Sequence, residues 1–432
     1  MYGFKDFDIR GTVEEGVDEN LAELVGVYFP DIVKTKKIMV GHDHRKTSSK
    51  FLKRLIKGLK SRGLKVYNLG LVSTPMFYRM VCINKFNAGI MVTASHSPKE
   101  QNGFKFVKKN AKPIYSVNGL NELEKLVINR PRRLVKKGSL IKVNDVINKY
   151  HKSLEKFIDV KKKLNIVVDP GNGMGALDID FLKRFSKVKV INKKIDPNFP
   201  GRGPNPIIPG VLKKLSETVK KEKADFGVGY DGDADRSVFV DNKGNILFAD
   251  YIMAFLTQYY VNPKETIVYD LRLSKVIEEI AKSKKIKVVK SKVGHSRVVD
   301  MMTQKDGKLG SEYSSHFYFK EINYTDSGLF TTMLLIDILS RTSSKLSHLL
   351  APYKKYSLSK EINLKVKDRK KINQFRKDTG KKSYLDGISV SKKTYWYNVR
   401  PSHTEDVVRI RVEAINKKIM DRVIRKIKSV LK

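Results

Sequence analysis

The sequence predicts an α/β protein built from several units, each with a buried sheet and flanking helices. Short apolar segments that end in Gly or Asp alternate with amphipathic segments of helical period, which is typical of this fold class. The pattern restarts at 164–169 and again at 266–270. The length of 432 residues also exceeds what one hydrophobic core supports. We therefore predict three similar α/β units with mixed sheets and a smaller C-terminal α+β unit.

The first unit is predicted to contain several strands and one clear amphipathic helix. The helix covers 49–62, where apolar residues recur at helical spacing, and Gly63 follows it as a stop signal. Strands are expected at 37–41, 65–69 and 87–92. The last of these strands delivers 93–98 to the carboxyl edge of the sheet, where α/β proteins bind ligands.

The later units follow from similar patterns. A strand at 226–230 is expected to lead directly into an acidic run, and 197–209 is rich in Pro and Gly, which predicts an irregular crossover. After about residue 350 the pattern changes to longer strands and a terminal helix at 416–431. The predicted domains are 1–145, 146–245, 246–352 and 353–432.

The chain carries a large positive charge, with 87 Lys and Arg against 45 Asp and Glu and a net charge of +42. Such an excess can mark a protein that binds nucleic acid. The lysines are scattered, however, and no basic segment has interleaved aromatics or zinc-ligand spacing. We therefore favour a solvated lysine-rich surface and expect no specific nucleic-acid partner. Weak association with RNA or acidic partners stays open as an alternative.

No segment is expected to enter a membrane or to form a disulfide. The first residues lack the apolar core of a signal peptide, and the best apolar run, 328–339, is too short to span a bilayer. Cys82 is the single cysteine and lies in an apolar segment, so we expect a buried small hydrophobe rather than a nucleophile. These features predict a cytoplasmic protein.

Two motifs about 140 residues apart indicate phosphoryl chemistry. Ser95 lies in the run Thr93-Ala94-Ser95-His96-Ser97-Pro98 and offers a hydroxyl in a tight turn. The run Asp231-Gly232-Asp233-Ala234-Asp235-Arg236 offers three carboxylates at alternate positions. A hydroxyl that carries a phosphoryl group needs a divalent cation, and alternating carboxylates can bind one. Together the motifs predict a phosphoserine held against Mg²⁺.

Other interpretations of these short motifs are weaker. The acidic run begins like an EF-hand loop, but Arg236 and Asn242 stand where that loop needs Gly and Glu. A surface turn without metal would leave three carboxylates repelling one another. Residues 171–176 formally match a dinucleotide fingerprint, with Asp196 about 20 residues further on. We favour instead a backbone turn that packs near the acidic run.

Two further loops carry groups suited to a sugar phosphate. The run 400–405 contains Arg400, Ser402 and Thr404, and a guanidinium with two hydroxyls is what a phosphate requires. The run 310–316 combines a carboxylate, hydroxyls and an imidazole, which can grip sugar hydroxyls and move a proton. Taken alone, a generic polar loop would explain either run about equally well.

With these segments in this order, the chain resembles the α-D-phosphohexomutase family, of the phosphomannomutase/phosphoglucomutase type. The resemblance covers nearly all 432 residues. The matching motifs are Phe7-Asp8-Ile9-Arg10-Gly11, Gly41-His42-Asp43-His44-Arg45, Ser73-Thr74-Pro75, 93–98, Asn102-Gly103-Phe104-Lys105-Phe106, 231–236, Lys292-Val293-Gly294-His295-Ser296, 312–316 and 400–405. The fold implied by the resemblance has four domains around a central cleft.

The resemblance also implies roles for individual residues. Ser95 resembles the phosphoserine, and one of its phosphoryl oxygens would complete a magnesium site with Asp231, Asp233 and Asp235. The residues implied to assist phosphoryl and proton transfer are Arg10, His96, Lys105, Arg236 and His316, with His316 or Lys105 as the candidate base. Those implied to bind the sugar are Glu312, Ser314 and His295. Those implied to clamp the phosphate that does not react are Arg400, Ser402, His403 and Thr404.

The implied reaction interconverts hexose 1-phosphate and hexose 6-phosphate, with mannose or glucose as the sugar. It passes through a hexose 1,6-bisphosphate, and Mg²⁺ is the implied cofactor. A phosphoglucosamine mutase is the alternative within the family. A non-catalytic mutase-fold protein that binds RNA or acidic partners and a phosphatase are the alternatives outside it. A monomer or a homodimer is expected.

The sequence departs from the family pattern at several positions. Phe7 stands where tyrosine is common, Ser97 replaces the usual Asn, and Asp406 replaces the usual Pro. Ser311 and Ser315 occupy positions that are normally Gly. If either backbone needs positive φ, a strain of roughly 1 kcal/mol follows. These changes affect the expected sugar specificity more than the chemistry, and His403 does not separate the subfamilies.

Overall fold

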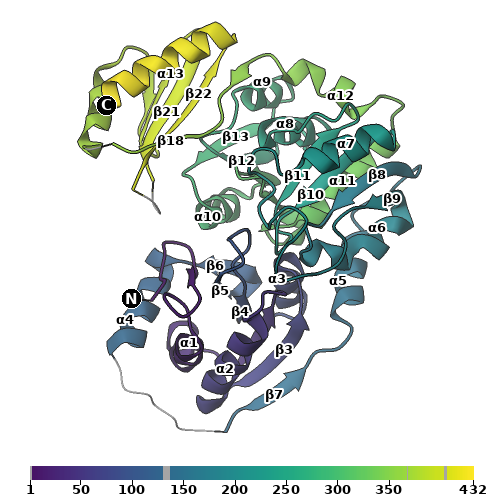
Figure 1. Ribbon diagram of the computed structural model, residues 1–432, viewed down its shortest axis with the longest axis vertical. Coiled ribbons are helices and arrows are strands. Elements are labelled where there is room, and N and C mark those ends of the chain that lie inside the picture. Colours follow the sequence, from purple (N-terminus) through teal and green to yellow (C-terminus); the bar gives the residue numbers. More distant parts are fainter. Residues whose placement is uncertain (1, 130–136, 367, 403–405) are drawn as a thin grey trace.

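The computed structural model describes residues 2–129, 137–366, 368–402 and 406–432, and these form four sheets that follow one another along the chain (Figure 1). The first sheet has the strand order β1-β5-β4-β2-β3-β7, with β6 paired to β5. Strands β4, β2, β3 and β7 are parallel, whereas β5 joins β4 antiparallel. The strands are β1 (Ile9–Thr12), β2 (Lys37–His42), β3 (Lys65–Leu71), β4 (Ala88–Val92), β5 (Gln101–Lys108), β6 (Lys112–Ile114) and β7 (Ser139–Lys142).

Helices cover both faces of the first sheet. They are α1 (Glu19–Val33), α2 (Ser48–Ser61), α3 (Thr74–Ile83) and α4 (Leu120–Asn129). Helices α1, α2 and α4 share one apolar core with the sheet, whereas α3 packs on the other face. Helices α1 and α2 touch at Gly26 and Gly58, where a Cβ on Gly26 would lie 2.3 Å from the Leu55 carbonyl oxygen. The α/β prediction for this unit is confirmed.

The second and third sheets are mixed. The second has the order β11-β10-β8-β9, and the third has the order β13-β12-β14-β15-β16. The strands are β8 (Leu164–Asp169), β9 (Ser186–Val190), β10 (Phe226–Tyr230), β11 (Ser237–Asp241), β12 (Thr266–Asp270), β13 (Lys287–Ser291), β14 (Leu309–Ser311), β15 (Phe317–Phe319) and β16 (Thr325–Asp326). The helices are α5 (Val146–Glu155), α6 (Ile179–Phe185), α7 (Lys213–Lys221), α8 (Ala249–Tyr259), α9 (Val276–Ser283), α10 (His295–Lys305), α11 (Gly328–Ser340) and α12 (Leu346–Leu349). One hydrophobic cluster includes buried residues of the first three sheets or their helices, so these units pack as one body.

The fourth sheet stands at the upper left of Figure 1 and has two different faces. Its order is β17-β22-β21-β20-β19, with β18 paired to β22. The elements are β17 (Ser357–Leu358), β18 (Ile362–Leu364), β19 (Lys381–Ser383), β20 (Ile388–Ser391), β21 (Tyr395–Pro401), β22 (Val408–Ala414) and α13 (Lys417–Leu431). Val399, Ile410 and Val412 pack with Val423 and Ile427 of α13. The alternate residues of β21 and β22 include Arg400, Arg409 and Arg411 and form a charged face.

The strands and helices named in the sequence analysis are present within a residue or two of their expected bounds. Asn416 accepts a hydrogen bond from the Ile419 amide at 2.9 Å and so caps α13 rather than joining it. The segment 197–209 has no helix or strand, as expected for a crossover. In the turn at 171–176, the Met174 amide donates to the Gly232 carbonyl at 3.0 Å, which confirms that this turn packs against the acidic run.

Some predictions concern the chain as a whole. Among the described residues, every helix is too short or too polar to cross a membrane. Cys82 is half-buried against the core, and burial raises the pKa of its thiol to about 12, which agrees with an inert role. The domain boundaries at 145, 245 and 352 stay predictions.

Candidate active site

Ser95 follows β4 in a loop and has an unusual backbone conformation. Its φ is +51°, in the left-handed region, and its side chain is buried. The Ser95 amide donates to Thr93 Oγ1 at 3.0 Å. The buried guanidinium of Arg45 donates to four carbonyl oxygens of this loop, those of Ser95 (2.8 Å), Ser97 (2.6 Å), Pro98 (2.7 Å) and Gln101 (2.9 Å). Arg45 therefore fixes the shape that presents the Ser95 hydroxyl.

The acidic run lies between β10 and β11, directly opposite Ser95. Ser95 Oγ donates to Asp231 Oδ2 at 3.0 Å. The carboxylates of Asp231, Asp233 and Asp235 are buried, and oxygen atoms of all three lie within 4.8 Å of one another. Burial and the neighbouring Asp235 and Asp233 raise the pKa of Asp231 well above its usual range. Three carboxylates held this close need a positive charge between them.

The donor set of this cluster fits a magnesium ion. All its donors are oxygens, which Mg²⁺ prefers over nitrogen or sulfur. Asp233 Oδ1 and Asp235 Oδ1 are buried and have no hydrogen-bond partner among the described residues. Thr74 Oγ1 donates to Asp233 Oδ2 at 2.6 Å and fixes that carboxylate from α3. Two oriented oxygens are thus left for a cation.

Lys105 of β5 supplies positive charge to the same cluster. Its Nζ lies 3.0 Å from Asp233 Oδ2 and also forms an ion pair with Asp235. Burial alone would lower the pKa of Lys105, but Asp233 and Asp235 outweigh it and raise that pKa well above its usual range. Lys105 is therefore a cationic partner of the acidic run in this state.

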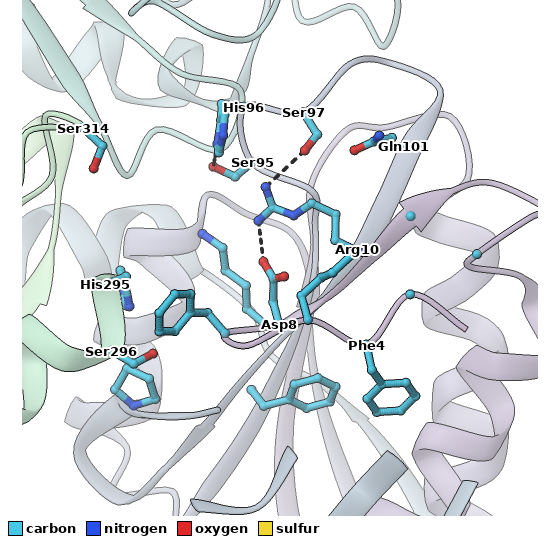
Figure 2. Close-up of a pocket in the computed structure, with 18 of the residues that line it drawn as sticks. Phe4, Asp8, Arg10, Ser95, His96, Ser97, Gln101, His295, Ser296 and Ser314 are labelled. Carbon is cyan, nitrogen blue, oxygen red and sulfur yellow. Dashed lines mark hydrogen bonds and ion pairs between the residues drawn. The ribbon is translucent and has the colours of Figure 1, made fainter. Parts of the chain in front are cut away.

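Arg10 and His96 line the approach to Ser95, and Figure 2 shows Arg10 reaching between Asp8 and Ser97. Its Nη1 donates to Ser97 Oγ at 3.1 Å, and its Nη2 pairs with Asp8 at 2.5 Å. His96 Nδ1 lies 3.3 Å from Ser95 Oγ. Burial and the nearby Arg236 guanidinium lower the pKa of His96 well below its usual range, so this imidazole is neutral.

His316 connects the second and third sheets. Arg236 Nε donates to His316 Nε2 at 2.9 Å, while His316 Nδ1 lies 2.6 Å from Asp326 Oδ2. Because Arg236 Nε can only donate, His316 Nε2 must accept, and its proton must lie on Nδ1 and point to Asp326. His295 Nε2 lies 3.2 Å from the same carboxylate. Burial would lower the pKa of His295, but Asp326 raises it overall.

These groups open into one cavity of about 870 Å³. It is lined by the predicted residues Arg10, Ser95, His96, Lys105, Arg236, His295, Glu312, Ser314 and His316. Figure 2 shows His295 and Ser314 across the cavity from Ser95 and Arg10. Glu312 is fixed by Tyr318, whose hydroxyl donates to it at 2.5 Å. The cavity thus joins the first three sheet units, and Arg10, Lys105 and Arg236 bring positive charge to its wall.

The predicted phosphate clamp lies apart from this cavity. Arg400 is on β21 of the fourth sheet, Ser402 follows the end of that strand, and neither lines the cavity. Arg400 Nη2 instead donates to Glu361 at 3.1 Å. His403 and Thr404 lie outside the described residues. The structure therefore places the predicted residues that it describes in two groups, one around the cavity and one, Arg400 and Ser402, in the fourth sheet unit.

The departures from the family pattern differ in consequence. Ser315 adopts φ of +65°, whereas Ser311 lies within β14 at an ordinary strand conformation. Only Ser315 therefore carries the strain expected of a non-glycine residue at positive φ. Phe7 lies against Gly294 and stacks with Arg297, whose guanidinium carbon is 5.8 Å from the ring centre. Phe7 thus contributes a contact between the first and third units.

Sequence reasoning missed several residues that orient the site. Asp43 accepts from Ser48 at 2.5 Å and from Thr93 at 2.7 Å, and it pairs with Arg45 at 3.3 Å. Asp43 and Arg45 lie in a motif that marked the family, yet they carried no assigned role. Asp326 belonged to no motif. Its place at the end of β16, just before α11, was the one signal in the sequence, since polar residues at strand ends often bind ligands.

Comparison with known proteins agrees with this fold. Four family models match the chain in succession: phosphoglucomutase/phosphomannomutase alpha/beta/alpha domain I over 1–130, domain II over 148–244, domain III over 248–356 and the C-terminal domain over 361–429. A phosphomannomutase of Methanocaldococcus jannaschii is 35% identical over 99% of this chain and 97% of its own length. A phosphomannomutase of Escherichia coli is 32% identical over 95% of this chain and 94% of its own length.

Solved structures show the same arrangement. A phosphoglucomutase/phosphomannomutase family protein of Burkholderia thailandensis, at 27% identity, superimposes with a TM-score of 0.93 over 100% of this chain and 98% of its own. Four sheet units, a buried serine and an acidic run facing it define a four-domain enzyme of the phosphohexomutase class. The chain belongs to the phosphoglucomutase/phosphomannomutase family.

Proposed function

We propose that this enzyme interconverts hexose 1-phosphates and hexose 6-phosphates through a phosphoserine at Ser95 and a hexose 1,6-bisphosphate intermediate. The observation that carries the proposal is the Ser95 hydroxyl, which lies 3.0 Å from a buried carboxylate of the acidic run, in the wall of a cavity that Arg10 and Lys105 also line. The full-length likeness to phosphomannomutases supports it. Mannose and glucose are the proposed sugars, in either order of preference.

In the proposed step, a sugar hydroxyl attacks the phosphorus of phosphorylated Ser95, the P–Oγ bond breaks, and the bisphosphate forms. Arg10, Lys105 and Arg236 hold positive charge around the transferring group, where most of the stabilisation in phosphoryl transfer arises. A magnesium ion bound by Asp231, Asp233, Asp235 and a phosphoryl oxygen on Ser95 would add charge neutralisation at the same place. Positioning and charge therefore dominate the proposed chemistry.

The attacking hydroxyl must lose a proton, and His316 is the better placed base. Lys105 is held protonated by Asp233 and Asp235 and cannot accept one in this state. His316 has its basic nitrogen Nε2 toward Arg236 and its proton toward Asp326. We propose that a phosphoryl group on Ser95 draws Arg236 away, which frees Nε2 to accept the hydroxyl proton.

The proposed clamp comprises Arg400, Ser402, His403 and Thr404, and it would bind the phosphate that does not react. Because Arg400 does not line the cavity, the fourth unit must approach the cavity for this contact. Such closure would also exclude water, which otherwise hydrolyses a phosphoserine. Glu312, Ser314 and His295 are proposed to contact the sugar. A cytoplasmic location, supported by the single cysteine, and a monomer or homodimer complete the proposal.

A coupled assay tests the proposal. Mannose 1-phosphate, glucose 1-phosphate and glucosamine 1-phosphate are each supplied with Mg²⁺ and a trace of the matching 1,6-bisphosphate. Turnover of the first two is expected. Turnover of glucosamine 1-phosphate alone would assign the phosphoglucosamine branch. Phosphate release without isomerisation would indicate a phosphatase. No turnover, with RNA binding that weakens steeply with salt, would favour a non-catalytic protein.

A further inference from the structure

Three arginines converge on the carboxylate of Glu361 where the third and fourth sheets meet. The shortest distances from their guanidinium nitrogens to the carboxylate are 3.2 Å for Arg272, 3.1 Å for Arg400 and 3.7 Å for Arg409. Arg272 follows β12, whereas the other two belong to β21 and β22. The Glu361 side chain, which precedes β18, is only 14% exposed. One half-buried carboxylate therefore contacts three arginines from two sheet units.

The register of the fourth sheet makes this anion necessary. Arg400 and Arg409 are directly opposite each other on β21 and β22. Like charges at such cross-strand positions repel, and Arg400 is almost completely buried. Burial would raise the pKa of Glu361, but Arg272, Arg400 and Arg409 outweigh it and lower the pKa to about 2. Glu361 thus stays ionised and offsets the repulsion between the arginines.

Tyr313 ties this cluster to the sugar-binding loop. The Glu361 amide donates to the Tyr313 hydroxyl at 3.0 Å. The Tyr313 ring lies between two guanidinium groups, with the central carbon of Arg272 at 5.1 Å and that of Arg411 at 4.7 Å from the ring centre. Arg272 is further held by Asp270, whose Oδ2 also accepts from the Tyr313 amide at 2.9 Å. The positions of Tyr313, Arg272 and the Glu361 backbone are therefore fixed by these contacts.

Tyr313 connects the arginine cluster to the cavity through its neighbours in the chain. Its two neighbours, Glu312 and Ser314, line the cavity that faces Ser95. Residues that meet the sugar are therefore one peptide bond from a side chain that orders the arginine cluster. Among the described residues, Arg400 Nε is buried without a hydrogen-bond partner, so this guanidinium keeps a donor for a further anion.

We propose that Glu361 is a positioning residue for phosphate binding, which holds Arg400 ready and couples it through Arg272 and Tyr313 to the sugar loop. The Glu361 backbone is fixed by its hydrogen bond to Tyr313, and its carboxylate contacts Arg272 and Arg400 from there. The ligand is the phosphate of the sugar phosphate that does not react. This inference rests on the proposed function.

The variant Glu361→Gln tests the inference, because it removes the charge and keeps both the shape and the amide that contacts Tyr313. We expect KM for the hexose phosphate to rise about tenfold or more, with kcat changed less than about twofold, since outer partners of a binding group typically contribute this much. Glu155→Gln is the matched control, since Glu155 pairs with Arg184 on the surface of α5 and α6. It should leave KM unchanged.

Two outcomes would overturn the inference: an unchanged KM, or a lower KM, which would show that the carboxylate competes with the substrate phosphate. Tyr313→Phe is the second variant; it keeps the ring between the arginines, loses the hydroxyl, and should raise KM in the same direction. A parallel calorimetric titration uses glucose 1-phosphate without Mg²⁺ or bisphosphate, so no turnover is needed. Weaker binding by Glu361→Gln than by the parent protein supports the inference even where the proposed reaction fails. Equal binding in a parent protein that turns over hexose phosphates sinks the inference alone.

Discussion

The Asp326 carboxylate lies 2.6 Å from His316 Nδ1 and fixes which nitrogen of that ring carries the proton. Arg236 closes the other side, because its Nε donates to His316 Nε2 at 2.9 Å. The imidazole thus has its Nδ1 proton toward Asp326 and its accepting nitrogen Nε2 toward Arg236. A buried carboxylate that orients a histidine in this way is a common device for general bases.

Asp326→Asn should therefore lower kcat by about 10²-fold to 10⁴-fold, because the amide can stabilise the wrong tautomer of His316. KM should change little. Steady-state kinetics with a hexose 1-phosphate provide the measurement. Asp337→Asn is the control, since Asp337 pairs with Arg341 on the outer side of α11. Equal activity of both variants would contradict the role of Asp326.

Ser95→Ala should abolish phosphoryl transfer and leave the fold intact. The loop is shaped by Arg45 and by the Ser95 backbone, neither of which depends on the hydroxyl. Intact-mass measurement after incubation with a hexose 1,6-bisphosphate should show one added phosphoryl group on the parent protein and none on the variant. Ser139→Ala, on the exposed strand β7, should behave as the parent. Full mutase activity in Ser95→Ala would refute the mechanism.

Mg²⁺ should raise the Tm of the protein, and the increase should be larger in Lys105→Met than in the parent. The Lys105 ammonium pairs with Asp233 and Asp235, so it competes electrostatically with a cation at the same carboxylates. In Lys105→Met the affinity for Mg²⁺ should increase, and each tenfold gain adds about 1.4 kcal/mol to the stabilisation at a fixed excess of the ion. Thermal shift with and without EDTA measures this. Lys108→Met, on the same strand, should match the parent, and an equal Mg²⁺ response in Lys105→Met would argue against competition.

Ser315→Gly and Ser311→Gly should affect stability in different ways. Ser315 has φ of +65°, so glycine removes strain there, by up to about 1 kcal/mol, and offsets its own entropic cost. Ser311 lies in β14, where glycine brings only the cost, again about 1 kcal/mol. The denaturation midpoint of Ser315→Gly should therefore equal or exceed that of the parent. The midpoint of Ser311→Gly should be lower. A more stable Ser311→Gly would contradict the backbone assignment.

Glu413 should make stability depend on pH. Burial raises the pKa of this β22 carboxyl to about 7, above its ordinary value of 4.5. The folded protein therefore keeps the proton between these two values while the unfolded chain releases it, so the free energy of unfolding falls as pH rises through this range. The total fall is at most about 3 kcal/mol.

Glu413→Gln removes this titration. The variant should be more stable than the parent at pH 8 and nearly equal at pH 5, which Tm values at both pH values would show. Glu222→Gln, on the surface near Lys189, should show no such difference. A constant gap between Glu413→Gln and the parent from pH 5 to pH 8 would contradict the raised pKa.

The sequence predicted the strands and helices well because their signals are local. Alternating apolar segments and a glycine stop were sufficient for α2, and an acidic run after an apolar segment was sufficient to place the Asp231 carboxylate at a strand end. Ser95 and Asp231 could be paired because both follow strands of α/β sheets, whose carboxyl ends collect ligands. The close approach of their side chains, at 3.0 Å, agrees with that reasoning.

Contacts between distant, individually ordinary residues could not be predicted in this way. Nothing near Asp326 in the sequence indicates that it meets His316, and Glu361 stands in an unremarkable polar segment. Their environments depend on how whole sheet units pack, which local patterns do not encode. The position of Arg400 away from the cavity depends likewise on how the fourth sheet docks, through its charged face, onto the third.

The grip of Arg45 on four carbonyl oxygens has one more consequence. In the proposed cycle, hydrolysis would now and then remove the phosphoryl group from Ser95, and a loop shaped by that group would then lose its conformation. Arg45 shapes this loop without that group, so the unphosphorylated serine would stay where a bisphosphate could phosphorylate it again. An accidental hydrolysis would then interrupt the proposed cycle without inactivating the enzyme permanently.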